Sequence, residues 1–450
     1  MSFTVQGQNV VVAGGGRSGL AAADLLLSRG AHVTLSDLYE PAGAEPLRRR
    51  GVVVDVGPHR TDLFAGADLI VLSPGVPPDQ EAVQAARRAG VPVIGEIELS
   101  SRWLQGRVIA ITGTKGKSTT TTLTARMFEE AGMDSTAGGN LGQALSSQVA
   151  SSHPQTLHVV EVSSFQLETT DRFHPWIAVL LNISPDHLDR HPSFDAYAAA
   201  KARVFANQTA DDWAVVNADD APAMALARDA RARRFDFALD ADVSNGVTIE
   251  DGEIVRRDHG KTAALVPLSA VRLPGRHLLG DVLAATTVGC VAGVPPAAMR
   301  RAVERFKGLP HALEHVADID GVAFVNDSKA TNIASARRSI ESFPSGVVAI
   351  MGGKFKGGDF ADLRDTVRAH ATGIVAIGEA APLIESALGQ AVPVRRAASM
   401  TDAVTAAFAM ARPKGVVVLA PACSSFDMFR DYVDRGEQFR AAVTALEGRN

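Results

Sequence analysis

A segment rich in glycine and lysine carries the strongest chemical signal in this 450-residue chain. It reads Gly113-Thr-Lys-Gly-Lys-Ser-Thr119 and follows the apolar run Val108–Thr112. The backbone amides of such a loop surround a phosphate at the start of a helix, and a lysine adds positive charge. The loop is a shortened form of the common phosphate-binding motif and predicts nucleoside triphosphate binding; a plain glycine-rich surface turn is the alternative. The binding residues would be Gly113, Thr114, Lys115, Gly116, Lys117, Ser118 and Thr119.

Two further polar residues follow apolar runs farther along the chain. Glu161 ends the run that begins at Val159, and His187 follows the run Ile177–Leu181. A carboxylate downstream of a phosphate loop is a typical Mg²⁺ ligand, although Glu161 could also cap a helix. An isolated histidine is usually structural, but a shared sheet edge favours a metal or phosphate role for His187.

A third motif, Gly14-x-Gly16-x-x-Gly19, lies between an expected strand and an expected helix, and Asp37 ends the next strand. These glycines allow a diphosphate to approach the amino terminus of a helix. A nicotinamide dinucleotide, another diphosphate, or a tight turn that merely requires glycine would each explain the pattern.

The elements that must position these residues follow an alternating pattern. Short apolar runs such as Val10–Val12, Val33–Leu35 and Leu69–Leu72 alternate with helical stretches rich in alanine and leucine. This alternation predicts an α/β fold of parallel sheets covered by helices, and it restarts at Val108–Thr112 and Val322–Asn326.

The chain length predicts about three domains. Breaks near residue 96 and after the expected helix Pro296–Arg305 give predicted domains of residues 1–96, 97–307 and 308–450. Within the second of them, the segment Asp240–Lys261 predicts an antiparallel hairpin that turns at Asp251-Gly252.

Composition excludes several classes of protein. Hydrophobic residues make up 46% and charged residues 21%, which excludes a disordered chain. Aromatic residues are 5% and the net charge is −5, so no nucleic-acid partner is expected and anionic substrates need local sites. The two cysteines, Cys290 and Cys423, are too few for a disulfide framework. We find no membrane span and no signal peptide, and we expect a cytoplasmic protein.

Lys201 lies in the alanine-rich stretch Tyr197–Arg203, and its spacing alone predicts a solvated lysine. In combination, however, the phosphate loop, the Glu161 strand, the His187 segment and Lys201 resemble the Mur ligases. These are ATP-dependent amide-forming enzymes of peptidoglycan assembly. The resemblance covers essentially the whole chain.

The last third of the chain is similar to the branch of that family that adds D-glutamate. The similar segments are Asn326–Asn332, Gly352–Lys356, Leu419–Phe429 and Arg435-Gly-Glu437, and the Asp-Asn-Pro-Arg motif of the diaminopimelate-adding branch is missing.

The resemblance implies a Rossmann-like N-terminal domain for the nucleotide sugar, a central P-loop-type ATPase domain with a parallel sheet, and a Rossmann-like C-terminal domain for the amino acid. For UDP-N-acetylmuramoyl-L-alanine it implies contacts from Gly16, Ser18, Asp37, Ser73, Pro74, Gly75, Asn140, Gln166 and His187. For D-glutamate it implies Lys329, Thr331, Lys356, Ser425, Phe426 and Tyr432, and for ATP it adds Asp281, His311 and Asp327 to the loop residues.

The implied reaction transfers the γ-phosphoryl group of ATP to the alanyl carboxylate, and the amine of D-glutamate then attacks the acyl-phosphate. Catalysis would rest on Lys117, Glu161, His187 and Lys201. Two Mg²⁺ ions would be held by Ser118, Glu161, His187 and a carbamylated Lys201. The implied partners are these small molecules alone, acting on a monomer with no membrane partner.

The chain departs from the family pattern near ATP. Lys115 stands where asparagine is usual, Ala312 replaces an arginine, and Leu278 and Asp281 replace two asparagines. We hypothesise that Lys115 restores part of the charge lost at position 312.

Three other functions remain open at this point. A nicotinamide-dependent dehydrogenase would explain the first glycine motif but not the phosphate loop. An ATP-binding switch without ligation would explain only that loop. A related ligase, adding another amino acid or glutamate to a folate, would share most of the motifs.

Overall fold

Four β-sheets form the framework of the described part of the chain, which covers residues 3–187, 190–273, 275–355 and 357–448 of a computed structural model. The chain divides into two compact units. The first comprises Met1–Val271 and Gly280–Arg305, and the second comprises Arg272–Leu279 and Phe306–Asn450. The α/β architecture predicted from the alternating pattern is confirmed, while the exact domain limits stay a prediction. Helices long and apolar enough to cross a bilayer are absent from the described residues.

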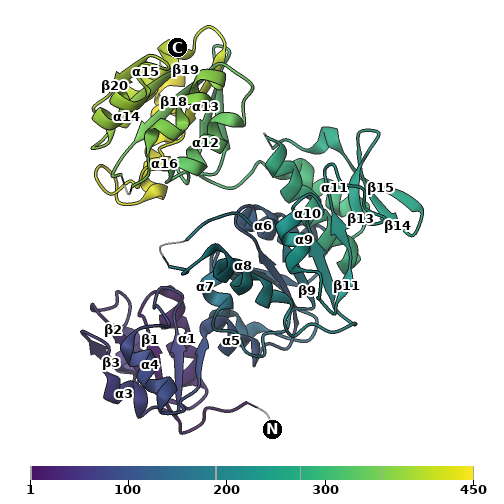
Figure 1. The fold of residues 1–450 in the computed structure, drawn as a ribbon, viewed down its shortest axis with the longest axis vertical. Helices are drawn as coiled ribbons and strands as arrows, with labels where there is room; N and C mark the ends of the chain where they lie inside the picture. The colour runs from purple at the N-terminus through teal and green to yellow at the C-terminus, as the bar shows by residue number, and fades with distance from the viewer. Residues whose placement is uncertain (1–2, 188–189, 274, 356, 449–450) are drawn as a thin grey trace. The chain divides into compact units, whose positions relative to one another are not determined.

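The N-terminal sheet of the first unit is parallel throughout, with the strand order β3-β2-β1-β4-β5. Figure 1 labels β1, β2 and β3 of this sheet, in purple. Its strands are β1 (Asn9–Ala13), β2 (His32–Asp37), β3 (Val53–Val56), β4 (Leu69–Leu72) and β5 (Val93–Gly95). The helices beside it are α1 (Arg17–Ser28), α2 (Glu45–Arg49), α3 (Thr61–Ala65) and α4 (Glu81–Arg88). Val10 and Val12 share a core with α1, whereas Val11 and Ala13 share one with α3 and α4. The strand order reverses between β1 and β4, so the loops after them form the crevice in which such sheets bind ligands.

The first glycine motif is required by the packing of this crevice. Gly14 has a φ of +91°, which favours glycine, and the Ser73 hydroxyl donates to its carbonyl oxygen at 2.8 Å. A Cβ added at Gly19 would overlap the Gly14 carbonyl oxygen, so only glycine lets α1 approach the end of β1 this closely.

The central sheet of the first unit is also parallel, with the order β11-β10-β9-β6-β8-β7. Its strands are β6 (Arg107–Thr112), β7 (Ser135–Gly139), β8 (Leu157–Glu161), β9 (Ile177–Leu180), β10 (Trp213–Val216) and β11 (Arg233–Arg234). The helices of this part of the chain are α5 (Glu96–Ser101), α6 (Lys117–Glu130), α7 (Ser164–Leu167), α8 (Phe194–Ala202), α9 (Ala221–Leu226), α10 (Arg276–Ala292) and α11 (Pro296–Arg305). Strand β6 lies between β8 and β9, so the segments after these three strands meet at one edge of the sheet.

A small sheet contains the predicted hairpin. Its strands, in the order β12-β13-β14-β15, are β12 (Asp236–Phe237), β13 (Asn245–Glu250), β14 (Glu253–Asp258) and β15 (Lys261–Pro267). Asp251 and Gly252 both have positive φ, as a two-residue hairpin turn requires, and β13 and β14 pair antiparallel across them. The hairpin is confirmed, and β15 extends it by a third antiparallel strand.

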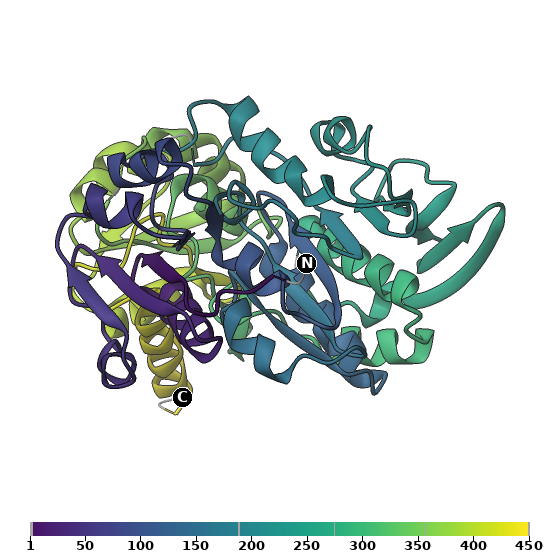
Figure 2. The same ribbon diagram turned by 90° about the horizontal axis from the view of Figure 1, so that it is seen from below.

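The sheet of the second unit has the order β16-β17-β21-β18-β19-β20, and only β16 among these strands runs antiparallel to its neighbour. The strands are β16 (Glu314–Ile319), β17 (Val322–Asn326), β18 (Val347–Gly352), β19 (Ala371–Ile377), β20 (Val394–Arg396) and β21 (Gly415–Leu419). The helices are α12 (Ile333–Glu341), α13 (Arg364–His370), α14 (Ala381–Leu388), α15 (Met400–Ala411) and α16 (Tyr432–Glu447). Figure 2 shows α16 as the yellow helix that leads to the C terminus.

Both faces of this sheet are buried, as its continuous apolar strands require. Alternate residues of β18 share one core with α12, α13 and α14 and the other core with α15 and α16. The sheet therefore presents its polar groups at its carboxyl edge, where the chain leaves the strands.

Helix α5 carries a buried carboxylate that ties it to a distant loop of the first unit. The Glu98 side chain is fully buried, and its Oε2 accepts hydrogen bonds from the backbone amides of residues 171, 172 and 173 at 2.8–2.9 Å. Its Oε1 accepts from the guanidinium of Arg102 at 2.8 Å. The carboxylate thereby satisfies three amides at the turn before β9.

We expect Glu98→Gln to lower the free energy of unfolding of the first unit by about 1–3 kcal/mol, because it removes the charge of a buried acceptor that binds three backbone amides. Urea unfolding followed by circular dichroism measures the change. Glu81→Gln is the control, since the Glu81 side chain is 72% exposed and pairs only at the surface with Arg88. Equal stability of the two variants would contradict this role for Glu98.

Candidate active site

The phosphate loop has the predicted position between β6 and α6. Gly113 and Gly116 have φ values of +151° and +85°, and α6 begins at Lys117, so the loop amides and the helix start face one region. The Lys117 ammonium donates to the carbonyl oxygens of Gly113 and Thr114, both at 3.0 Å. A bound phosphate would offer this ammonium a fully charged partner in place of two neutral ones.

Glu161 joins two parts of the first unit at the end of β8. Its Oε2 accepts a hydrogen bond from the Ser118 hydroxyl at 2.7 Å, and its Oε1 accepts one from the Asn140 amide at 2.6 Å. The structure thus brings together Ser118 and Glu161, two of the predicted metal ligands. A hydroxyl and a carboxylate oxygen are ligands that Mg²⁺ prefers.

Lys201 is buried, which corrects the solvated lysine that its spacing alone predicts. Its side chain in α8 is only 2% exposed, because the alanine-rich helix packs against the phosphate loop. Its Nζ donates to the Gly113 carbonyl oxygen at 2.8 Å and lies 4.9 Å from the centre of the Tyr197 ring. Burial, and secondarily the charge of Lys117, lowers the pKa of Lys201 to about 6. The amine is therefore largely neutral at physiological pH.

His187 lies near two aromatic rings, those of Phe165 and Tyr197. Its ring meets Phe165 edge-on with centroids 4.9 Å apart and lies 6.5 Å from the Tyr197 ring. His187 also has a φ of +55°, an uncommon conformation for this residue type. Groups of three or more histidine, cysteine, aspartate or glutamate side chains arranged for a metal are absent from the residues the structure describes. A metal here would therefore depend on hydroxyl, phosphate or modified-lysine oxygens as well.

Asp281 lies against the phosphate loop. Its side chain is 6% exposed and bonds with Thr119, and a Cβ added at Gly116 would overlap its carboxyl group. Burial raises the pKa of Asp281 to about 8. Leu278, one turn earlier in α10, packs instead against an apolar core of the second unit.

A cavity of about 580 Å³ occupies the crevice of the N-terminal sheet. Of the nine residues predicted to contact the nucleotide sugar, seven line it: Gly16, Ser18, Asp37, Ser73, Pro74, Gly75 and Asn140. The Asp37 carboxylate accepts hydrogen bonds from the amides of Gly15 at 2.6 Å and Tyr39 at 3.0 Å, which fixes the wall of the cavity. Because Asn140 also bonds to Glu161, the cavity connects to the metal-ligand pair.

Gln166 lies beside this cavity. It lines a small adjoining pocket with Ser73 and Pro74, and its side chain accepts from the Ser163 amide at 2.9 Å as part of a helix cap. His187 is absent from the described lining of both spaces.

The sequence did not reveal several residues of the cavity wall, namely Arg17, Leu38, Tyr39, His59 and Gln80. Tyr39 is 78% exposed at the rim, and His59 bonds through Nδ1 to the Ser36 hydroxyl at 2.8 Å. Two signals could have found some of them: Arg17 lies inside the first glycine motif, and Leu38 and Tyr39 directly follow Asp37.

In the second unit, the residues predicted to bind D-glutamate follow β17 and β21, which are neighbours in the sheet. Lys329 is exposed, Phe426 is 65% exposed and Tyr432 is 39% exposed, whereas Ser425 is buried and Thr331 is partly buried. Lys356 lies outside the described residues. These described residues offer one cation, the hydroxyls of Thr331 and Ser425, and two accessible aromatic rings.

His311 and Asp327, predicted to approach ATP, make hydrogen bonds that fix the loops next to β16 and β17 of this sheet. His311 is buried with a φ of +63°, and its carbonyl oxygen accepts from the Lys329 amide at 3.0 Å. A Cβ added at Gly436 would overlap the His311 ring, so α16 needs glycine there. Asp327 accepts from the Leu313 amide at 3.2 Å and from the Ser339 hydroxyl, and burial raises its pKa to about 6. Contact of either residue with ATP stays a prediction.

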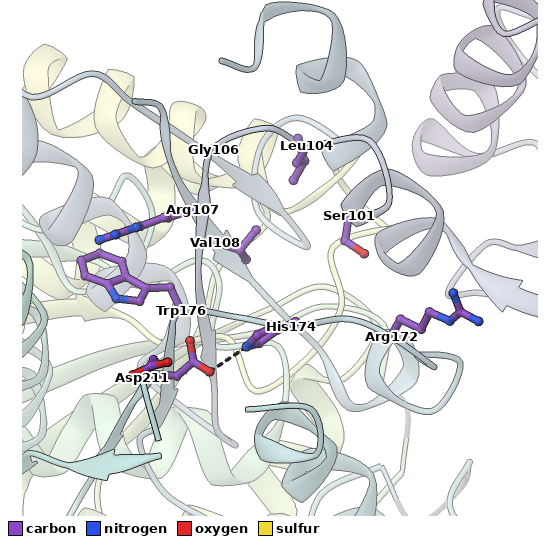
Figure 3. A pocket seen from close by; sticks show the side chains of 10 residues that line it. Ser101, Leu104, Gly106, Arg107, Val108, Arg172, His174, Trp176 and Asp211 are labelled. Carbon is purple, nitrogen blue, oxygen red and sulfur yellow. Dashed lines mark hydrogen bonds and ion pairs between the residues drawn. The ribbon is translucent and has the colours of Figure 1, made fainter. Parts of the chain in front are cut away.

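Another cavity, of about 410 Å³, lies where β6 and β9 begin, away from the predicted site residues (Figure 3). Its polar groups engage one another: Arg107 lies over the Trp176 ring at 4.5 Å, and His174 bonds to Asp212 at 2.6 Å. This cavity lacks the phosphate loop, the glycine motif and the carboxylate pair, so the candidate active site lies at the opposite, carboxyl edge of the strands.

Comparison with known families matches three models in succession along the chain. The Mur ligase MurD-like N-terminal domain matches residues 8–95, the Mur ligase middle domain residues 111–289, and the Mur ligase glutamate ligase domain residues 313–423.

Two relatives are similar over nearly their full length. A UDP-N-acetylmuramoylalanine–D-glutamate ligase from Acidobacterium capsulatum is 45% identical and covers 99% of this chain and 98% of its own. One of the same name from Geotalea daltonii is 42% identical and covers 99% of each chain.

Solved structures share the fold. The UDP-N-acetylmuramate-alanine ligase MurC of Thermotoga maritima has a TM-score of 0.61 at 18% identity, over 98% of this chain and 100% of that one. The MurF ligase of the same organism, solved in complex with ADP, has a TM-score of 0.60 at 15% identity, over 99% and 96%.

Lys115 is the loop residue whose charge can be tested separately from the loop backbone. Its amide donates to the Asn182 side chain at 2.9 Å, and its carbonyl oxygen accepts from the same side chain at 3.1 Å. Its Nζ lies 3.5 Å from Asp186, and the side chain is 37% exposed.

We expect Lys115→Asn to raise the KM for ATP by roughly threefold to tenfold, because a partly exposed cation near a polyphosphate is lost while Asn182 still holds the backbone. Steady-state kinetics at varied ATP measures the effect. Lys261→Asn, which removes an exposed lysine from the small sheet, serves as the control. An unchanged KM in Lys115→Asn would rule out a contribution of this charge.

Proposed function

The chain belongs to the Mur ligase family, and we propose that it is the ATP-dependent ligase that adds D-glutamate to UDP-N-acetylmuramoyl-L-alanine in peptidoglycan precursor synthesis. The observation that carries this proposal is the identity of 45% and 42%, over nearly the whole chain, with two ligases of that name. The glycine motif that also suits a nicotinamide dinucleotide lies within the match to the MurD-like N-terminal domain. A dehydrogenase would leave the phosphate loop without a role.

Each of the three larger sheets supplies one substrate site in this proposal. Residues 1–96 bind the nucleotide sugar, residues 97–307 bind ATP, and residues 308–450 bind the amino acid. The N-terminal cavity supports the first assignment, since most of the predicted nucleotide-sugar residues line it. The phosphate loop after β6 supports the second.

The first step brings together two anions, the γ-phosphoryl group of ATP and the alanyl carboxylate. Positive charge and oriented amides must therefore stabilise the transition state. Lys117 can exchange its two carbonyl partners for phosphate oxygens, and the amides at the start of α6 add to its effect. The product of this step is an acyl-phosphate and ADP.

The residues present fit Mg²⁺. The hydroxyl of Ser118 and the carboxylate of Glu161, 2.7 Å apart, would hold one ion, and His187 with a modified Lys201 would hold a second. Bound Mg²⁺ supplies neutralisation of phosphate charge. Asn140 orients Glu161 through its other oxygen, so that Oε2 faces Ser118.

Lys201 suits carbamylation. Its neutral amine can attack CO₂, forming an N–C bond and releasing a proton, which converts a buried amine into an anionic oxygen ligand. The low pKa favours this reaction, since only the neutral amine is nucleophilic. A plain ammonium would repel a metal at the same position.

The second step takes place at the carboxyl edge of the C-terminal sheet. Lys329 and Lys356 would pair with the two carboxylates of D-glutamate, with Thr331, Ser425, Phe426 and Tyr432 around them. The free amine attacks the acyl carbon, an amide bond forms, and phosphate leaves. His311 and Asp327 hold the loops beside this site and are proposed to approach ATP, as is Asp281 beside the phosphate loop. The proposal needs small-molecule partners only and places a monomer in the cytoplasm.

The proposed activity is tested by phosphate release with ATP, UDP-N-acetylmuramoyl-L-alanine and a panel of D- and L-amino acids. We expect release that depends on D-glutamate and on the nucleotide sugar together. Release with another amino acid would indicate a related ligase, and release that ignores amino acids would indicate an ATP-binding switch. NADH binding in place of nucleotide-sugar binding would favour the dehydrogenase.

We expect Lys201→Ala to abolish ligation and to remove a carbamate signal that ¹³C-bicarbonate produces in the wild-type protein by NMR. Because the amine of Lys201 gains its proton below a pH of about 6, the signal should fade as the pH drops through that value. Lys261→Ala is the control, since it removes an exposed lysine. Full activity or an undiminished signal in Lys201→Ala would exclude the carbamate.

A further inference from the structure

Arg435 is the largest side chain among those fully buried in the described residues, and the proposed function gives it no task. It lies in the first turn of α16, within the Arg435-Gly-Glu437 motif, and it is 0% exposed. A buried guanidinium is costly unless its donors are satisfied, so its partners indicate what it holds together.

The guanidinium binds oxygens of three separate segments. Its Nε donates to the Ser328 hydroxyl at 2.9 Å, and Nη2 donates to the Ser328 carbonyl oxygen at 2.8 Å. Its Nη1 donates to the carbonyl oxygen of Cys423 at 3.1 Å and, at 3.5 Å, to that of Gly352. One planar group thus spans the three loops.

These loops follow β17, β18 and β21, three adjacent strands of the sheet. Each leads toward the proposed amino-acid site in the sequence, because Lys329 follows Ser328, Lys356 comes four residues after Gly352, and Ser425 lies two residues after Cys423. The Ser328 hydroxyl in turn donates to the Tyr432 carbonyl oxygen at 2.7 Å.

The last two loops also pair with each other. The Lys354 amide donates to the Ser424 carbonyl oxygen at 2.9 Å, and the Ser424 amide returns a bond to Lys354 at 3.1 Å. Ordering one of these loops therefore orders the other.

In the described part of the chain, the hydrogen-bond acceptors of Arg435 are all neutral oxygens. Within the described residues, carboxylates at ion-pair distance from it are absent, and Asp427 acts on it only through a longer-range attraction. Burial lowers the pKa of Arg435 to about 10, which still leaves it charged at neutral pH. A buried cation without an anionic partner favours an anionic ligand nearby.

We propose that Arg435 is a positioning residue for the acidic amino-acid substrate, which sets the three loops of the C-terminal sheet in the binding geometry and adds positive potential behind them. This inference rests on the proposed function. Lysine cannot replace the arginine fully, because an ammonium is a point charge and cannot reach three carbonyl groups in one plane.

The test compares Arg435→Lys and Arg435→Gln with the wild-type protein. We expect the KM for D-glutamate to rise roughly tenfold in Arg435→Lys, and further in Arg435→Gln, because charge-assisted hydrogen bonds that set the loops are lost. The KM for the nucleotide sugar, which binds in the first unit, should stay within about twofold.

Phe439→Leu is the matched control. Phe439 lies one turn later in α16, is fully buried, and packs in an apolar core instead of donating hydrogen bonds to the three loops. It should lower the melting temperature as a core truncation does, but leave the KM for D-glutamate unchanged.

An unchanged KM for D-glutamate in both arginine variants would overturn the inference, as would a parallel rise of all KM values in these variants and in Phe439→Leu. If an arginine variant fails to fold, Ser328→Ala decides, since it removes only the hydroxyl between Arg435 and Tyr432. An unchanged KM there would overturn the inference. A wild-type protein that ignores D-glutamate would instead refute the proposed function.

Discussion

The two hydrogen bonds of the Glu161 carboxylate are the interaction on which the arrangement of the first unit's site depends. One oxygen accepts from Ser118 at the start of α6, and the other accepts from Asn140, whose side chain also lines the N-terminal cavity. A single buried acid at the end of β8 thus fixes the relation between the phosphate loop and the N-terminal cavity. Neither of these partners carries a formal charge, so neither competes with a cation for the carboxylate.

Two lysine side chains, Lys117 and Lys201, lie close together at the same edge of the sheet. Lys117 and Lys201 both donate to the Gly113 carbonyl oxygen, so two amines share one backbone acceptor. Two full charges there would repel each other, and burial removes the conflict by favouring the neutral form of Lys201. The site therefore keeps one permanent cation for phosphate and one amine available for chemistry.

Much of the fold could be predicted from local patterns. The strands Leu69–Leu72 and Val322–Asn326 and the helix Pro296–Arg305 have the bounds expected from their apolar runs, and the hairpin turns at the glycine expected. These features depend on neighbouring residues alone. The burial of Lys201 depends on how α8 packs against the phosphate loop, which lies almost ninety residues earlier in the chain. The spacing of residues within the helix cannot predict such a distant contact.

The site residues divide in the same way. Glu161 and Ser118 could be paired in advance because the ends of parallel strands converge at one edge. His59 could not be predicted as a cavity residue from the sequence, because its position is set by a hydrogen bond to Ser36, 23 residues earlier in the chain. Likewise, nothing in the local sequence of Asp327 indicates that its oxygens hold Leu313 and Ser339.

Gly436 makes α16 unusually intolerant of substitution at one position. A glycine inside a helix normally costs about 1 kcal/mol relative to alanine, so replacement with alanine is a common route to a more stable protein. Here the added methyl group would displace the His311 ring, and with it the carbonyl oxygen that holds the Lys329 amide. A redesign of this helix guided by helix propensity alone would therefore introduce a change that disturbs the loop carrying Lys329, and libraries for thermostability should keep this position fixed.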